Sequence, residues 1–241
     1  MRGVSALYVI QVAGRLADPA RAMTIEVKIC GLRDEAALDA ALAGGADYVG
    51  FVFLARSPRN ILPQAARTLA DKARGKAKVV ALFVDPDDAL LAEVIETVSP
   101  DIVQLHGAET PARVAEIAQR FGLPVMKAVA VAGARDVQAA LTYVGSADRI
   151  LFDAKAPEDD AGALPGGNGV AFDWRALAGL EGRIDYMLAG GLDPGNVAEA
   201  IRSTGARAVD VSSGVESRPG EKDPDLIRRF IHAAKTAKQT P

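Results

Sequence analysis

Cysteine and histidine are scarce in this sequence, which has one cysteine and two histidines in 241 residues. The single cysteine, Cys30, cannot form an intramolecular disulfide, which excludes a small secreted protein held together by disulfides. A catalytic metal site usually needs several histidine, cysteine or carboxylate ligands. Because His232 falls in the last predicted helix, far from His106, we expect no metal site.

Long apolar runs and an excess of positive charge are also absent. No apolar run approaches the roughly 18 residues that suggest a membrane-spanning helix. The formal net charge of −3 gives no overall basic field, which argues against nucleic-acid binding. With 49% hydrophobic and 24% charged residues, the composition is that of an ordinary globular protein. We therefore expect a cytoplasmic protein with no nucleic-acid or membrane partner.

The first 22 residues differ from the rest of the chain. Val4 to Ala13 is mildly apolar and follows Arg2, as in a signal peptide, but Gln11 interrupts it and no convincing cleavage site follows. We predict that residues 1–22 form a loosely ordered extension, or that Met23 is the natural start. A single catalytic domain is expected to occupy residues 23–241.

From Thr24 onward, apolar segments alternate with Ala-rich helical segments. This alternation predicts right-handed crossovers and a parallel sheet. The predicted strands are 25–30, 48–53, 79–84, 102–106, 125–130, 149–153, 186–189 and 207–211. The predicted helices are 34–43, 63–73, 87–97, 110–121, 134–142, 173–179, 194–203 and 223–237.

The number of repeated units predicts an α/β fold of one particular kind. Eight strand-helix units in a chain of this length favour a single (β/α)₈ barrel, the TIM barrel, with the short N-terminal extension in front of it. An open, doubly wound sheet is the alternative, but no Gly-x-Gly-x-x-Gly follows the first strand. Asp193 and Asp223 are candidate N-caps. First-turn prolines are expected at Pro63, Pro111, Pro194 and Pro224.

The first strand carries a candidate base or nucleophile. Active sites of such barrels lie at the carboxyl ends of the strands. Strand alternation places Lys28 and Cys30 on one face, with Val27 and Ile29 on the other. A lone buried cysteine is usually an inert small hydrophobe. Here the nearby Lys28 favours the thiolate, which would make Cys30 a usable base or nucleophile.

The sixth strand ends in a candidate acid, Asp153. Its carboxyl group could simply cap local backbone N–H groups. At the mouth of a barrel, partly withdrawn from water, it would favour its protonated form and could serve as a general acid. Cys30 and Asp153 are then a candidate base and acid from opposite walls of one pocket.

The seventh and eighth strands end in small residues. Gly190-Gly191 follows one strand, and Ser212-Ser213-Gly214 follows the next. Glycine lets the backbone approach a ligand closely, and N–H groups near a helix N-terminus favour negative charge. These turns are a candidate phosphate site, although both dipeptide types also occur in ordinary strand-to-helix turns.

Other polar residues lie near the predicted strand ends. Arg59, in a basic cluster with Arg56, could be solvated or could clamp a carboxylate bidentately. Gln104, His106 and Asp210 could orient a substrate or satisfy hydrogen bonds inside the barrel. The segment 154–171, rich in Gly, Pro and acidic residues, predicts a lid or a disordered insertion.

With these residues in place, the chain closely resembles the phosphoribosylanthranilate isomerases of tryptophan biosynthesis. The matching segments keep the family order between residues 25 and 237. They are Val27 to Gly31, Asp47 to Phe53, Ser57 to Arg59, Val103 to Gly107, Asp153, Phe172 to Trp174, Ala189 to Asn196, and Val209 to Glu216.

The resemblance implies an Amadori rearrangement of N-(5-phosphoribosyl)anthranilate to 1-(2-carboxyphenylamino)-1-deoxyribulose 5-phosphate, with no cofactor. It implies that Asp153 is the general acid and Cys30 the general base. It further places Arg59 near the anthranilate carboxylate and Asp210 against the substrate. The phosphate would lie at Gly190, Gly191, Ser212, Ser213 and Gly214.

Several alternatives stay open at this point. The histidine-pathway ribonucleotide isomerase would call for an aspartate in place of Cys30, and indole-glycerol-phosphate synthase for a different lysine and glutamate set. A metal-dependent epimerase would need more histidines. A barrel that only binds phosphorylated ligands would not need both Cys30 and Asp153. The oligomeric state could be a monomer or a homodimer.

Overall fold

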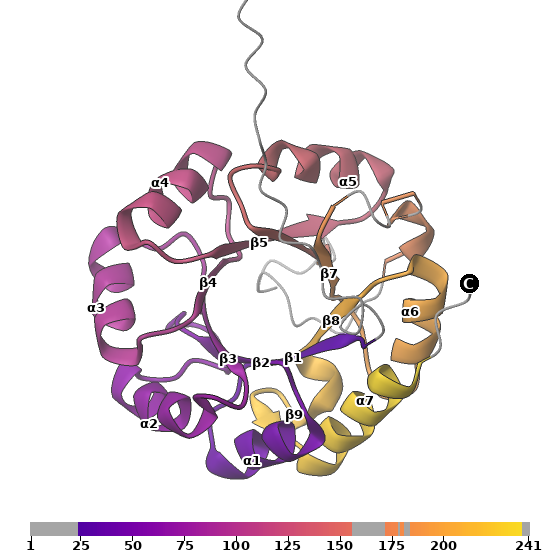
Figure 1. Cartoon of the computed structure of the whole chain (residues 1–241), viewed down its shortest axis with the longest axis horizontal. Helices are drawn as coiled ribbons and strands as arrows, with labels where there is room; N and C mark the ends of the chain where they lie inside the picture. The colour runs from indigo at the N-terminus through magenta and orange to yellow at the C-terminus, as the bar shows by residue number, and fades with distance from the viewer. Residues whose placement is uncertain (1–23, 156–171, 178, 181–183, 238–241) are drawn as a thin grey trace, which may run out of the picture.

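The computed structural model describes residues 24–155, 172–177, 179–180 and 184–237. Residues 1–22 and most of the predicted lid lie outside this part of the chain. Eight parallel strands close into a barrel in sequence order, so the (β/α)₈ prediction is confirmed (Figure 1). The strands are β1 Glu26–Cys30, β2 Tyr48–Val52, β3 Lys78–Phe83, β4 Ile102–Leu105, β5 Val125–Val131, β6 Arg149–Ala154, β7 Tyr186–Leu188 and β8 Ala208–Val211.

Helices surround the barrel and cover its outer surface (Figure 1). Pro63, Pro111 and Pro224 lie in first helical turns, as predicted. Asp223 caps α7 by accepting hydrogen bonds from the N–H groups of Asp225 and Leu226. The helices are α1 Glu35–Gly44, α2 Pro63–Ala73, α3 Asp88–Val98, α4 Pro111–Phe121, α5 Ala134–Ala140, α6 Val197–Thr204 and α7 Pro224–Thr236.

Two predicted helices differ from the structure. Between β6 and β7, the described residues form only a short 3₁₀ helix, η3 (Trp174–Leu177), which Gly179 follows at a φ of 83°. The sixth α-helix begins at Val197 rather than at Pro194. The carboxylate of Asp193 accepts hydrogen bonds from the N–H groups of Gly195 and Asn196, so it closes a turn before the helix.

The barrel has one core outside the sheet and another inside it. Val27 and Ile29 are fully buried in the outer core against the helices, as the alternation predicted. Lys28 and Cys30 therefore point inward. The interior is packed by Tyr48, Val80, Met126, Ala128, Leu151, Met187, Ala189 and Ala208.

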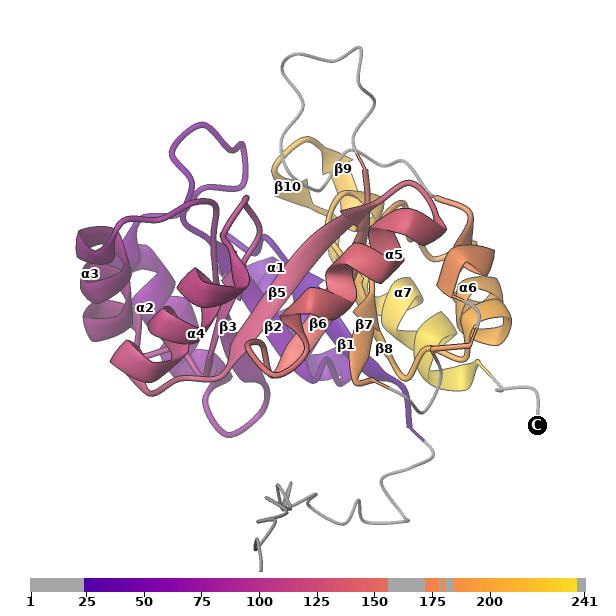
Figure 2. The same cartoon turned by 90° about the horizontal axis from the view of Figure 1, so that it is seen from above.

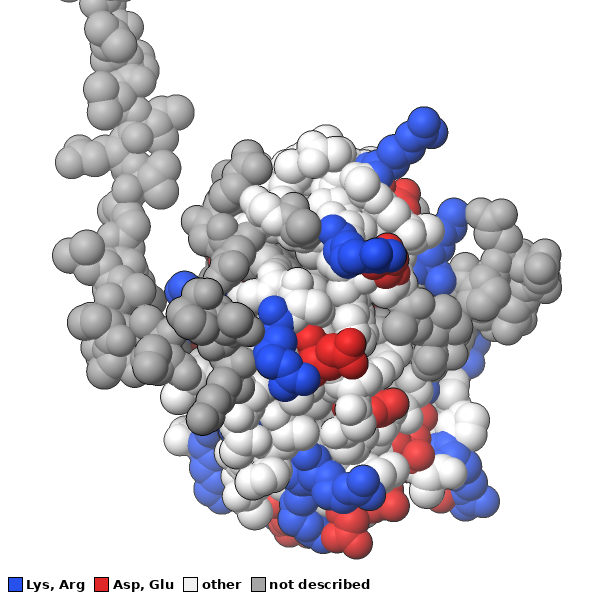
Figure 3. All heavy atoms as spheres, turned by 90° about the vertical axis from the view of Figure 1, so that its right-hand side faces the viewer, with Lys and Arg blue, Asp and Glu red and all other residues white. Residues whose placement is uncertain are grey.

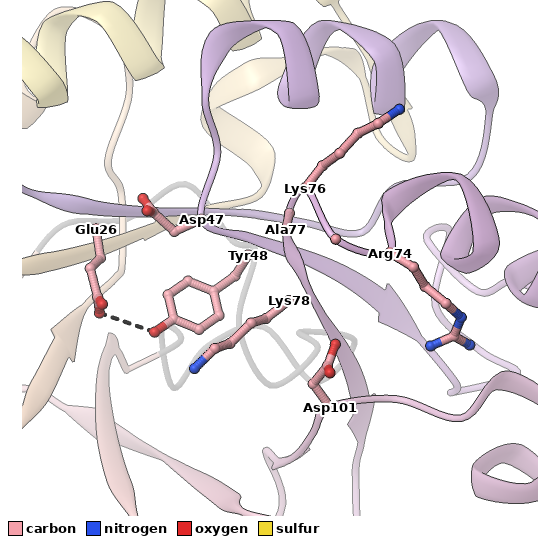
Figure 4. Close-up of a pocket in the computed structure, with 9 residues that line it drawn as sticks. Glu26, Asp47, Tyr48, Arg74, Lys76, Ala77, Lys78 and Asp101 are labelled. Carbon is pink, nitrogen blue, oxygen red and sulfur yellow. Dashed lines mark hydrogen bonds between the residues drawn. The ribbon is translucent and has the colours of Figure 1, made fainter.

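A polar network lies at the amino ends of the strands. The Tyr48 hydroxyl donates to Glu26 at 3.0 Å (Figure 4). Nη1 of Arg149 lies 2.7 Å from the same carboxylate. Burial raises the pKa of Tyr48 to about 12. The adjoining pocket is lined by residues such as Lys78 and Asp101 and contains none of the predicted site residues.

A hairpin that the sequence did not predict stands at the carboxyl ends of the strands (Figure 2). It consists of β9 (Glu216–Arg218) and β10 (Glu221–Lys222), after a 3₁₀ helix, η4 (Ser213–Val215). Gly220 has a φ of 82°, and a Cβ atom there would lie 2.4 Å from the carbonyl oxygen of Pro58. The hairpin therefore packs closely against the loop between β2 and α2.

Acidic and basic side chains are interspersed on the side of the molecule that Figure 3 shows. No helix in the described ranges is both long and apolar enough to span a membrane.

Candidate active site

The carboxyl ends of the strands bring four predicted residues into the barrel mouth. Cys30 ends β1, Gln104 lies in β4, Asp153 in β6 and Asp210 in β8. All four are buried. Their hydrogen bonds and ion pairs divide them between two groups, one on the β1–β8 side and the other on the β4–β6 side.

The first group places a lysine beside Cys30. Lys28 is fully buried, and its Nζ lies 3.0 Å from Oδ1 of Asp210 on the neighbouring strand. A Cβ atom on Gly50 would lie 3.1 Å from the sulfur of Cys30 and 3.3 Å from Cε of Lys28. Because Gly50 has no side chain, the thiol of Cys30 and the stem of Lys28 both fit against its backbone.

The electrostatics of this group differ from the simple expectation. Burial raises the pKa of the Cys30 thiol, and Asp210 adds to the rise, whereas Lys28 lowers it only in part. Burial also disfavours the charged form of Lys28, but Asp210 and Cys30 outweigh it and raise the lysine pKa. Lys28 does favour the thiolate, as predicted. Its effect is smaller than that of burial, so the thiol predominates at neutral pH.

The second group fixes the orientation of Asp153. Nε2 of His106 lies 3.2 Å from Oδ2 of Asp153, and the N–H of Ala154 donates to Oδ1 at 2.9 Å. Nε2 of Gln104 lies 3.4 Å from the other ring nitrogen of His106. Gln104 and His106 therefore make hydrogen bonds inside the barrel, one of the two roles considered for them, although the buried Oε1 of Gln104 has no hydrogen-bond partner among the described residues. Contact with a substrate stays a prediction.

A second buried lysine supports the loop that carries His106. Nζ of Lys127 lies 2.8 Å from Glu109 and 2.6 Å from the carbonyl oxygen of Gly107. Both charged side chains are buried. The sequence analysis missed this pair, although a lysine within the apolar strand β5 is the same kind of signal as Lys28 in β1.

The glycine and serine turns lie against each other. Gly190 and Gly191 have φ values of 85° and 64°. A Cβ atom on Gly214 would lie 1.9 Å from the carbonyl oxygen of Leu192, so only glycine fits between the turns. Among the described residues, the N–H groups of Gly190, Gly191 and Ser213 donate to no protein acceptor. Two adjacent strand ends therefore present donors at one place, as a phosphate site requires.

Arg59 enters the site, whereas Arg56 is exposed. Nε and Nη2 of Arg59 lie 2.7 and 2.9 Å from the two carboxylate oxygens of Glu216. Nζ of Lys222 lies 2.6 Å from the same carboxylate. The sequence analysis gave neither Glu216 nor Lys222 a role. No group of three His, Cys, Asp or Glu side chains within the described ranges could hold a metal ion.

The sequence model of the family described as N-(5'phosphoribosyl)anthranilate (PRA) isomerase matches residues 27–233. The chain belongs to this isomerase family. A phosphoribosylanthranilate isomerase from Paramagnetospirillum magneticum is 56% identical over 213 residues, covering 88% of this chain and 98% of the relative. The family and the isomerase activity implied by the sequence are therefore confirmed.

Solved structures of phosphoribosylanthranilate isomerases share this barrel. One contains reduced 1-(o-carboxyphenylamino)-1-deoxyribulose 5-phosphate, with 37% identity, a TM-score of 0.76, and coverage of 88% of this chain and 98% of that one. Another shows monomers generated from the dimeric isomerase of Thermotoga maritima, with 38% identity, a TM-score of 0.75 and the same coverage. Both monomeric and dimeric forms therefore occur among related isomerases.

Replacing Lys28 by methionine is expected to raise the pKa of Cys30 further. An opposite charge within about 4–6 Å shifts a pKa by roughly one to three units, so its loss disfavours the thiolate. Cys30 is the only cysteine, so its rate of alkylation by iodoacetamide, followed by intact mass against pH, reports this ionisation alone.

The double variant Lys28→Met, Asp210→Asn avoids leaving a buried carboxylate without its lysine. Lys78→Met, at the amino end of β3, is the matched control. If the alkylation profile of Lys28→Met coincided with those of the control and the wild type, Lys28 would have no influence on the thiol.

Proposed function

We propose that Asp153 and Cys30 are the general acid and the general base of the isomerisation. The substrate is N-(5-phosphoribosyl)anthranilate, and the product is 1-(2-carboxyphenylamino)-1-deoxyribulose 5-phosphate. Asp153 donates its proton to the furanose ring oxygen, the bond from C1′ to that oxygen breaks, and the amine nitrogen forms a Schiff base with C1′. Cys30 as thiolate then removes the proton from C2′, which gives an enolamine. The enolamine takes up a proton at C1′ and releases the proton of its C2′ hydroxyl, so that C2′ becomes the carbonyl carbon of the ketose.

One observation carries this assignment. Cys30 and Asp153 lie on different walls of the same barrel mouth, and each has a polar partner of its own. Cys30 lies on β1 with Lys28 beside it, and Asp153 lies on β6 in contact with His106. An acid and a base in separate environments can hold different protonation states at one pH. A barrel that only bound a ligand would need neither.

The ligand has three features for which the site offers partners. The free N–H groups at the ends of β7 and β8 suit the phosphate. Arg59 suits the anthranilate carboxylate, because a guanidinium binds carboxylates bidentately. Asp210 can accept a hydrogen bond from a sugar hydroxyl. A related isomerase is solved in complex with the reduced, phosphorylated and carboxylated product, which supports a ligand with these features.

The chemistry needs no cofactor, because the oxidation at C2′ and the reduction at C1′ occur within one molecule. The reaction belongs to tryptophan biosynthesis. We further infer that the isomerase acts in the cytoplasm as a monomer or homodimer. In the domain organisation that we propose, residues 23–241 form the catalytic barrel and residues 1–22 an extension that catalysis does not require.

The test is a direct assay of the purified full chain. N-(5-phosphoribosyl)anthranilate is generated in situ, and the loss of its fluorescence is followed with and without the protein. We expect a first-order loss proportional to protein concentration and formation of the ketose, identified by mass spectrometry after borohydride reduction. A folded protein that binds the reduced product but produces no ketose would support the non-catalytic barrel instead.

A further inference from the structure

Glu216 makes a full set of hydrogen bonds at the edge of the proposed site. Its Oε1 accepts from Nε of Arg59 at 2.7 Å and from Nζ of Lys222 at 2.6 Å. Its Oε2 accepts from Nη2 of Arg59 at 2.9 Å and from the N–H of Gly220 at 3.2 Å. A carboxylate has about four acceptor positions, so this group is saturated.

The ammonium group of Lys222 also uses all of its hydrogen-bond donors. Besides Glu216, its ammonium group contacts the carbonyl oxygen of Ser212 at 2.9 Å and the Ser212 hydroxyl at 3.2 Å. An ammonium has three donors, and three acceptors surround this one. The Ser212 hydroxyl in turn donates to the carbonyl oxygen of Cys30 at 3.2 Å. Lys222 therefore connects the hairpin to the proposed phosphate turn and to the strand of the proposed base.

Close packing holds the Arg59 side chain in this position. A Cβ atom on Gly31 would lie 2.9 Å from Cδ of Arg59, so the arginine stem lies directly over the backbone after β1. Gly220 in the hairpin fits against Pro58, the residue before Arg59. The guanidinium thus has a carboxylate at its Nε–Nη2 edge, and the backbone of Gly31 lies against its stem.

The charges of this group favour an anionic ligand. Arg59 and Lys222 contribute two positive charges and Glu216 one negative charge, which leaves a net charge of +1. Burial disfavours the charged carboxylate of Glu216, but the hydrogen bond from Arg59 and the charge of Lys222 outweigh it and hold the pKa of Glu216 below its usual value. Burial lowers the pKa of Lys222, and the contact with Glu216 offsets this effect in part.

We propose that Glu216, held by Lys222, is a positioning residue that orients Arg59 for the carboxylate of the substrate and so selects amines that carry this carboxylate. The inference rests on the proposed role of Arg59. Glu216 holds the guanidinium by its Nε–Nη2 edge, which fixes the direction in which the rest of the Arg59 fork points. Preventing rotation of the fork lowers the entropy lost on binding.

The experiment compares two ligands on each protein. The first is the borohydride-reduced product, and the second is the same compound made from aniline, which lacks the carboxylate. The selectivity is the ratio of their two Kd values, measured by calorimetry on the same preparation of the full chain. A loss of folded protein lowers the apparent stoichiometry for both ligands, so it does not alter this ratio.

We expect Glu216→Gln to reduce the selectivity by about tenfold, the size expected from weakening one charge-assisted hydrogen bond. Lys222→Met should reduce it as well, and Glu216→Asp, which keeps the charge, should retain more selectivity than Glu216→Gln. Glu221→Gln is the matched control, because Glu221 lies in the same hairpin and its exposed carboxylate pairs with Arg218 at the surface.

The Arg59→Met variant distinguishes the role of Arg59 in binding the carboxylate from the role of Glu216 in positioning Arg59. If Arg59→Met reduces the selectivity and Glu216→Gln leaves it at the wild-type value, the positioning role is overturned and the role of Arg59 stands. If Arg59→Met also leaves the selectivity unchanged, the carboxylate binds elsewhere. That outcome overturns the role of Arg59 and the inference together, without affecting the assignment of Cys30 and Asp153.

Discussion

Replacing Asp153 by asparagine is expected to lower kcat by roughly 10²- to 10⁴-fold, the usual contribution of a positioned general acid. The two side chains have nearly the same shape. The amide oxygen of asparagine can accept a hydrogen bond from the N–H of Ala154, or from His106, as the carboxylate does now. The variant therefore keeps the architecture of the mouth, but it has no acidic proton for the ring oxygen. Single-turnover measurements with enzyme in excess would measure the ring-opening step directly.

The matched control for this substitution lies at the other end of the barrel. Asp101 accepts a hydrogen bond from the N–H of Val79, which an asparagine amide oxygen can also accept. Asp101→Asn should therefore leave kcat within about twofold, as expected for a change far from the reacting atoms. A folded Asp153→Asn variant with a wild-type kcat would mean that another group opens the ring.

Replacing Cys30 by serine is expected to cost as much, about 10²- to 10⁴-fold in kcat, because a hydroxyl is a far weaker acid than a thiol and forms almost no anion at neutral pH. The raised pKa of Cys30 adds a pH dependence. Because the active form needs an ionised Cys30 and a protonated Asp153, one limb of the kcat/KM profile reports the thiol. That limb should lie above the usual pH range of a cysteine thiol, because burial disfavours the thiolate. The residual activity of Cys30→Ser should lack this limb.

A control for the loss of packing is available at the same position. Cys30→Ala removes the sulfur, while Cys30→Ser replaces it with a group of similar size. If deprotonation by the thiolate is the lost step, both variants should be similarly inactive, and both should still bind the reduced product. A serine variant with nearly wild-type kcat would exclude Cys30 as the base.

The sequence predicted the barrel well because strands and helices are indicated by patterns within short segments of the chain. Apolar segments such as Val79 to Phe83 lie between helices with recognisable first turns, and their order alone implies a parallel sheet. The same order placed Cys30 and Asp153 at strand ends. The helix expected at 173–179 failed because a short Ala-rich stretch is compatible with a single 3₁₀ turn.

The sequence could not predict contacts between residues that are distant in the chain and come together only on folding. Glu216 binds an arginine 157 positions earlier, and no local pattern indicates that partner. The net shift of the Cys30 pKa depends on how completely the barrel excludes water, which is a tertiary property. The position of Lys28 two residues before Cys30 correctly predicted that the lysine lowers the thiol pKa. It did not predict that the net shift of this pKa is upward.

The junction between β1 and β8 has a consequence for the order of assembly. The two strands pair from Glu26 with Ala208 to Ile29 with Val211, and Lys28 meets Asp210 across 182 positions of the chain. On the ribosome, β1 is made first and keeps one unpaired edge until β8 has emerged. The catalytic end is therefore completed last. Activity of a nascent chain should appear abruptly with ring closure rather than grow with length.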